Sequence, residues 1–193
     1  LIAETLKIAE RCHFCLSELR YEYPAELVPE GISVSQHLRS RVFEGARLQR
    51  SLRADLHGDA RLLLVEPVIF GRAAMGERLH DAALRDRIEI RRDGVPLYSD
   101  AVRLEGDLTV QMARPAVGGG AGAMACIVYV GADAEGRLAQ LRSHLPATGG
   151  ASLLRPDVLV ARVLAEDGFT LRKTLLPALD LLSGHGLPVS WRL

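Results

Sequence analysis

The residues best placed to do chemistry lie in segment 66–77, which reads EPVIFGRAAMGE and directly follows the apolar residues 62–65. The segment holds two carboxylates, Glu66 and Glu77, and one arginine, Arg72. Because Glu66 follows four apolar residues, we expect its carboxylate to be partly buried, so that it must be ion-paired or metal-bound. Arg72 is the expected partner. Two interpretations stay open: a structural ion pair, which the sequence favours, and a functional polar site.

Asp100 raises the same question in a later segment. On a strand, Tyr98 and Val102 would share its side, so the alternation of side chains does not decide whether Asp100 is exposed. Glu66 or Glu77 could also act as the general base of a hydrolase. The sequence supplies no nucleophile or metal pattern to accompany them, so the hydrolase interpretation ranks last.

Three other motifs lack residues that their chemistry would need. Cys12 and Cys15 have C-x-x-C spacing, but a zinc site needs two further ligands and the sequence has no second such pair. The glycine-rich residues 118–122 lack the lysine and serine of a phosphate-binding loop. The six histidines are scattered singly. We therefore expect two small buried thiols, a flexible loop and solvated histidines rather than active sites.

The composition excludes several classes of partner. Of 193 residues, 48% are hydrophobic, which is ample for a core, and 24 basic residues balance 24 acidic residues. A net charge of zero argues against binding to nucleic acid or to an anionic membrane. The sequence has no apolar run of the roughly 18 to 20 residues that a membrane helix needs. With an odd number of cysteines, three, we expect a soluble cytoplasmic protein.

The elements that must position the carboxylates change in character near residue 42. Residues 1–41 predict a short helical and proline-broken segment that is not an independent domain. Beyond it, alternating or continuous apolar patterns predict strands at 48–56, 61–65, 84–92, 95–104, 123–130 and 157–165. Asp93 and Gly94 predict a two-residue hairpin turn. Helices are expected at 134–145 and 169–182, the second containing Pro177, which can kink or split it.

Residues 42–193 resemble the C-terminal portion of the urease accessory protein family UreD, also called UreH. Motifs in the order typical of that family are VFEGA at 42–46, GRAAMGE at 71–77, LRDR at 84–87, DAVRL at 100–104, ARP at 113–115, GGAS at 149–152 and PVSWRL at 188–193. The resemblance implies a mainly β fold, a superhelical array of strands with two helices in the C-terminal half.

The resemblance also implies a function and candidate site residues. UreD proteins are not enzymes; with UreF and the GTPase UreG they assist nickel insertion into apo-urease. A polar channel is proposed to carry the metal, and Glu66 and Asp100 stand where the family has acidic channel residues. Glu77 is a further channel candidate, and the signature includes Gly71, Arg72, Met75 and Gly76. We expect nickel in transit, at Glu66 and Asp100, and no tightly bound cofactor.

Residues 1–41 resemble a segment of error-prone DNA polymerase III alpha subunits. The similar stretches are TLKIAERC at 5–12, LSELRYEYP at 16–24, PEG at 29–31 and SQHL at 35–38. The two resemblances overlap at residues 42–47, which predicts a chimeric chain whose UreD-like domain is incomplete at its N-terminus. Missing strands would expose sheet edges and favour aberrant association. The alternative function is a fragment of a polymerase-type replication protein joined to a non-functional domain.

Overall fold

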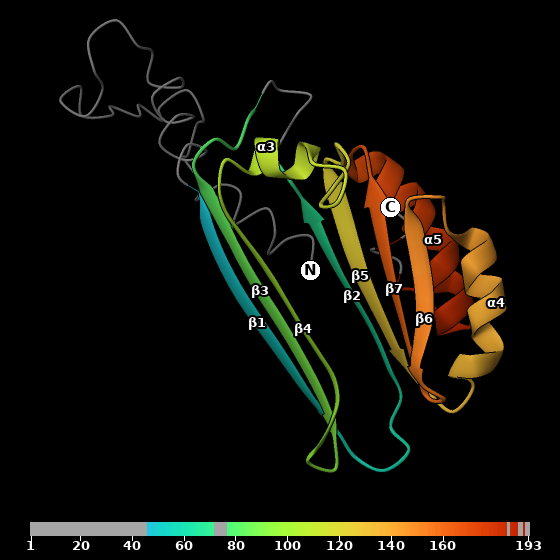
Figure 1. Cartoon of the computed structure of the whole chain (residues 1–193). Helices are drawn as coiled ribbons and strands as arrows, with labels where there is room; N and C mark the ends of the chain where they lie inside the picture. Colours follow the sequence, from blue (N-terminus) through green and yellow to red (C-terminus); the bar gives the residue numbers. More distant parts are fainter. Residues whose placement is uncertain (1–45, 72–76, 185, 189–190, 192–193) are drawn as a thin grey trace, which may run out of the picture. The chain divides into compact units, whose positions relative to one another are not determined.

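The structure is a computed structural model that describes residues 46–71, 77–184, 186–188 and 191. The predictions for residues 1–41, including the C-x-x-C pair, lie outside the described residues. Strands are the predominant secondary structure of the described residues, as the sequence predicts (Figure 1).

The strands form two open sheets. The three-stranded sheet has the order β1 (Arg47–Leu56), β3 (Ala82–Arg92) and β4 (Val95–Gly106). The four-stranded sheet has the order β2 (Leu62–Ile69), β5 (Ala123–Val130), β7 (Val158–Ala165) and β6 (Gly149–Arg155). Strands β1 and β3 pair in parallel, and the other pairs are antiparallel. Within the described residues these sheets do not form a superhelical array.

The predicted hairpin is confirmed. Strand β3 ends at Arg92 and β4 begins at Val95, so Asp93 and Gly94 are the two turn residues. Their φ angles are 49° and 80°, the left-handed values that a tight hairpin with the twist of a β-sheet requires.

Three helices occur in the described part of the chain, one more than predicted. Helix α4 (Ala134–His144) and helix α5 (Gly168–Ser183) cover one face of the four-stranded sheet, and α3 (Leu108–Ala113) follows β4 (Figure 1). Helix α5 begins where the Asp167 carboxylate accepts a hydrogen bond from the Thr170 amide and ends at Gly184, with φ 66°. Pro177 lies inside α5 without splitting it.

Strand β5 separates two apolar layers through its alternating side chains. Ile127 and Tyr129 face α4 and α5, where they pack with Leu175 and Leu179 of α5. The intervening residues pack against the three-stranded sheet, in a cluster formed by Cys126, Val128, Val130, Val158, Ile88, Ile90 and Tyr98. The four-stranded sheet is therefore the central layer, between the helices and the other sheet.

The chain also shows no helix, within the described residues, that is long and apolar enough to cross a membrane.

Candidate functional site: a polar pocket between the sheets

The space between the two sheets is apolar along part of its length and polar along the rest. In the four-stranded sheet, Glu66 of β2 pairs in register with Cys126 of β5, which pairs with Arg162 of β7. In the three-stranded sheet, Arg50 of β1 pairs with Asp86 of β3. Since side chains alternate along a strand, these positions share the inter-sheet side with the apolar cluster around Val128.

All of these polar residues except Arg50 line a pocket of about 280 Å³, together with apolar side chains such as Ile88 and Val163. Its lining includes Glu66, Asp86, Asp100, Cys126, Thr148 and Arg162. The structure therefore brings together in one pocket Glu66 and Asp100, the two residues that the resemblance names as channel candidates. We call this site the inter-sheet pocket.

The carboxylates of the inter-sheet pocket form ion pairs with arginines. The Arg50 guanidinium lies between two of them, with Nη1 3.1 Å from Glu66 Oε2 and Nη2 2.5 Å from Asp86 Oδ2. Arg162 donates through Nη2 to Asp100. The side chains of Asp86, Asp100 and Glu66 are 9%, 18% and 22% exposed. Such burial requires ion pairing, as the sequence predicts for Glu66, but the partner that the structure shows is Arg50.

Cys126, which lines the pocket, forms a neutral pair with Tyr98. The Tyr98 hydroxyl lies 3.4 Å from Cys126 Sγ, and both side chains are buried. Burial raises the pKa of the Tyr98 hydroxyl and also that of the Cys126 thiol. Cys126 is thus a thiol rather than a thiolate near neutral pH, and it is a poor metal ligand in that form.

The remaining candidates of the family signature lie outside the described residues or directly beside them in the sequence. Arg72, Met75 and Gly76 fall in residues 72–76, outside the described residues. Gly71 has φ 75°, and a Cβ placed there would lie 3.7 Å from Glu77 Cδ, so the two residues are neighbours at the end of β2. The pairing of Glu66 with Arg72 and the channel role of Glu77 stay predictions.

The carboxylates of the inter-sheet pocket have arginine partners. Over residues 46–71, 77–184, 186–188 and 191, no group of three or more histidine, cysteine, aspartate or glutamate side chains is arranged to hold a metal ion. The pocket carboxylates are oxygen ligands already shared with guanidinium groups. Sequence reasoning missed Asp86, Arg50 and Arg162, although LRDR at 84–87 pointed to the first.

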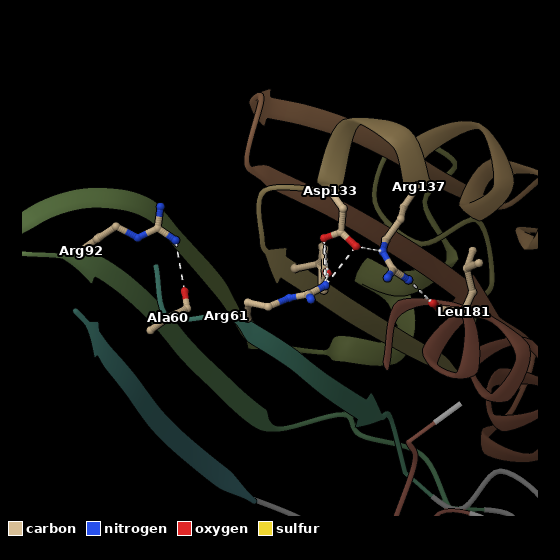
Figure 2. Close-up of polar contacts among 7 residues, drawn as sticks. Ala60, Arg61, Arg92, Asp133, Arg137 and Leu181 are labelled. Carbon is tan, nitrogen blue, oxygen red and sulfur yellow. Dashed lines mark hydrogen bonds and ion pairs between the residues drawn. The ribbon is translucent and has the colours of Figure 1, made fainter. Parts of the chain in front are cut away.

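A second polar cluster lies on the helix side of the four-stranded sheet, and we call it the Asp133 cluster (Figure 2). Arg61 Nη2 lies 2.9 and 3.0 Å from the two carboxylate oxygens of Asp133, and Arg137 Nε lies 2.7 Å from Oδ2. The Tyr129 hydroxyl donates to Oδ1 at 2.6 Å. Arg137 also donates to the carbonyl of Leu181, which ties α4 to the end of α5 (Figure 2).

Tyr129 joins the two arginines of the Asp133 cluster. The guanidinium carbons of Arg61 and Arg137 lie 5.7 and 5.4 Å from its ring centroid, within cation–π range. The hydrogen bond from Tyr129, followed by that from Arg137, lowers the pKa of Asp133 to about 2. Nearby, Arg92 bonds the Ala60 carbonyl at 3.2 Å and Asp157 at 2.5 Å. Arg61 thus links the start of β2 to Tyr129 of β5 and to Asp133 before α4, and Arg92 links the end of β3 to the residues before β2 and β7.

The fold and the inter-sheet pocket define a mainly β protein that holds ion-paired carboxylates between two open sheets. A family described as UreD urease accessory protein matches residues 39–191. The chain belongs to this family, which confirms the resemblance seen over residues 42–193. The match leaves most of the polymerase-like segment uncovered, so that second resemblance stays a prediction.

Individual relatives agree with the family match. The chain is 52% identical over 152 residues to "Urease accessory protein UreD" of Roseobacter denitrificans, covering 79% of this chain and 56% of the relative. It is 49% identical over 150 residues to the protein of the same name from Ruegeria pomeroyi, covering 78% and 58%. The chain thus spans a little over half the length of these curated relatives.

Proposed function

We propose that the chain supplies the pocket-bearing part of a urease accessory protein, a non-enzymatic scaffold that assists nickel insertion into apo-urease. The observation that carries the proposal is the meeting of Glu66 and Asp100 in one inter-sheet pocket, in a member of the UreD family. UreF, UreG and the urease subunits are the proposed partners, and the cytoplasm is the proposed site of action.

Carboxylates suit a route along which Ni²⁺ moves. Oxygen ligands hold Ni²⁺ less tightly than imidazole or thiolate ligands, so a carboxylate-lined path releases the ion to the next site. The thiol of Cys126, kept neutral by burial, does not oppose that release. We therefore propose that nickel is cargo in the inter-sheet pocket, with no tightly bound cofactor.

The superhelical strand array also belongs to this proposal. Strands β1 and β4 are the edges of one sheet, and β2 and β6 are the edges of the other, within the described residues. Further strands at such edges would extend the two sheets into the larger array. A structure of the chain extended to the length of its relatives tests that arrangement.

A urease activation assay tests the function. In the extended protein, replacing both carboxylates (Glu66→Gln with Asp100→Asn) should reduce nickel-dependent urease activity at least about tenfold, as expected when ion ligands are removed. Asp81→Asn is the matched control, because Asp81 forms an exposed ion pair with Arg47 away from the pocket. Full activation by the double variant would reject the pocket as the nickel route.

A further inference from the structure

Both ion pairs of the inter-sheet pocket connect one sheet to the other. Arg50 belongs to β1 of the three-stranded sheet and reaches Glu66 on β2 of the four-stranded sheet, at 3.1 Å. Arg162 belongs to β7 of the four-stranded sheet and reaches Asp100 on β4 of the three-stranded sheet. Each sheet therefore contributes one arginine, which is ion-paired with a carboxylate of the other sheet.

Arg50 is held by its terminal nitrogens and not by the whole guanidinium. Nη1 and Nη2 contact Glu66 and Asp86, whereas Nε is buried and has no hydrogen-bond partner among the described residues. A buried donor without a partner carries a desolvation cost, so this position of Arg50 depends on its two carboxylates. Anything that competes for those carboxylates also weakens the hold on Arg50.

Among the described residues, the charged groups of the pocket leave a surplus of one carboxylate. Glu66, Asp86 and Asp100 line it, and Arg50 and Arg162 are the guanidinium groups that contact them. A divalent cation that enters is attracted by the carboxylates and repelled by the guanidinium groups. It gains carboxylate oxygens as ligands only where an arginine gives them up.

The pocket has room for that exchange. Its volume of about 280 Å³ lies beside the ion pairs, and it can hold several water molecules, as a partly hydrated ion requires. The Arg162 side chain is 56% exposed and has solvent to move into. Arg50, with a side chain 29% exposed, is more enclosed. The pairs therefore border a cavity on one side rather than being packed on every side.

We propose that Arg50 and Arg162 are gate arginines, which occupy the pocket carboxylates when no divalent cation is present and release them as a cation passes. This inference rests on the proposed function, because it assigns a regulating role to residues of the same pocket. In this role the arginines weaken cation binding. They keep the carboxylates paired in the empty pocket and prevent the passing ion from being retained.

The test measures Ni²⁺ binding to the full chain by calorimetric titration. Arg50→Gln and Arg162→Gln should each tighten Ni²⁺ binding about tenfold, since each removes one repelling charge and frees carboxylate oxygens. Arg47→Gln is the matched control: Arg47 lies on β1 like Arg50, but its ion pair with Asp81 is exposed. Its Ni²⁺ affinity should equal that of the unchanged chain.

A second set of variants shows where the ion binds. Adding Glu66→Gln to Arg50→Gln, or Asp100→Asn to Arg162→Gln, should abolish the gain. Unchanged or weaker Ni²⁺ binding in both arginine variants would overturn the proposal, as would a gain that survives loss of the carboxylates. If the Arg50→Gln protein fails to fold, the Arg162→Gln protein decides the test. The Arg162 side chain is more exposed than that of Arg50, so its replacement should disturb folding less.

Failure of the gate and failure of the proposed function give different results. Unchanged Ni²⁺ affinity in the arginine variants, with urease activation still dependent on Glu66 and Asp100, would reject only the gate. Full urease activation without Glu66 and Asp100 would reject the nickel route, whatever the arginine variants bind.

Discussion

The inter-sheet pocket and the Asp133 cluster are both built from arginines and carboxylates, but in different proportions. In the Asp133 cluster, two arginines and the Tyr129 hydroxyl converge on a single carboxylate. In the inter-sheet pocket, two arginines contact three carboxylates, and a cavity lies beside them. Among the residues that the structure describes, donor side chains outnumber carboxylates in the first region, whereas carboxylates outnumber arginines in the second.

This difference separates a structural ion pair from a site that can accept a ligand. Asp133 is surrounded by donors, and its pKa is accordingly held near 2. It has no lone pair to spare for a cation, and its contacts join β2, β5, α4 and α5. The pocket carboxylates retain acceptor capacity next to open volume. Residue type alone does not distinguish the two regions, but the ratio of donors to acceptors does.

The largest effect on stability is expected at Asp133. Asp133→Ala leaves the Tyr129 hydroxyl and two guanidinium groups without their shared acceptor, and should lower the free energy of unfolding by about 2 kcal/mol. Urea denaturation followed by circular dichroism measures the change. Asp59→Ala, at an exposed position, is the control. Equal losses in the two variants would show that the Asp133 cluster is not structural.

Tyr129→Phe should have the next largest effect. Tyr129 is 2% exposed, and the packing of its ring is retained in phenylalanine, so the change removes mainly the hydrogen bonds that the hydroxyl makes with Asp133 and Arg61. We expect a loss of about 1 kcal/mol. In the Asp133→Ala background the same substitution should cost much less, which a double-mutant cycle measures. Additive losses would mean that Tyr129 stabilises the protein independently of Asp133.

Acid should weaken the Asp133 cluster in a defined pH range. The pKa of Asp133 falls from its ordinary 3.8 to about 2 in the folded chain. Its contribution to stability is therefore complete above about pH 4 and is lost as the pH falls through 2. Because the side chain is 44% exposed, solvent screening limits the part of this contribution that comes from ionisation to less than about 1 kcal/mol, which is smaller than the loss expected when the whole side chain is removed.

The measurement for this prediction compares two proteins at two pH values. Urea denaturation at pH 5 and pH 2.5 should show a larger loss for the unchanged chain than for Asp133→Asn, which has no charge to lose. Equal losses would assign the acid sensitivity to other carboxylates, among them Glu105, whose pKa is also lowered to about 2.

The smallest effect on stability is expected in the inter-sheet pocket. Glu66→Gln removes one charge, but Arg50 keeps Asp86 as a partner at 2.5 Å. We expect a change of at most about 0.5 kcal/mol in urea denaturation, even though the proposed nickel route requires Glu66. A loss as large as that of Asp133→Ala would mean that the pocket, too, is mainly a structural ion-pair network.

The sequence predicted those parts of the fold that depend on local patterns. Asp93 and Gly94 predicted the hairpin because both residue types tolerate the positive φ angles that its turn requires. The apolar runs predicted β5 and β7. Strand β6 was missed because it begins with Gly149 and Gly150, which have low strand propensity. Helix α3 was missed because six residues are too few for a periodic pattern.

The site was predictable only in part. Burial of Glu66 followed from the apolar residues before it, and the resemblance pointed to Asp100. Their meeting depends on how two sheets pack, which no local pattern encodes. Arg72, a near neighbour in sequence, was predicted as the partner of Glu66; it lies outside the described residues, so that pairing stays a prediction. The observed partner, Arg50, comes from a strand in the other sheet.

The parallel pairing of β1 with β3 has a consequence for how the chain folds. Each β1 residue pairs with the residue 36 positions later, for example Arg47 with Ala83 and Leu56 with Arg92. Strand β2 lies between them in sequence and belongs to the other sheet. The β3–β4 hairpin can form early from local contacts, but β1 must wait for a long loop to close around β2. Both sheets should therefore be completed in one cooperative step, and the pocket between them would exist only once that step is finished.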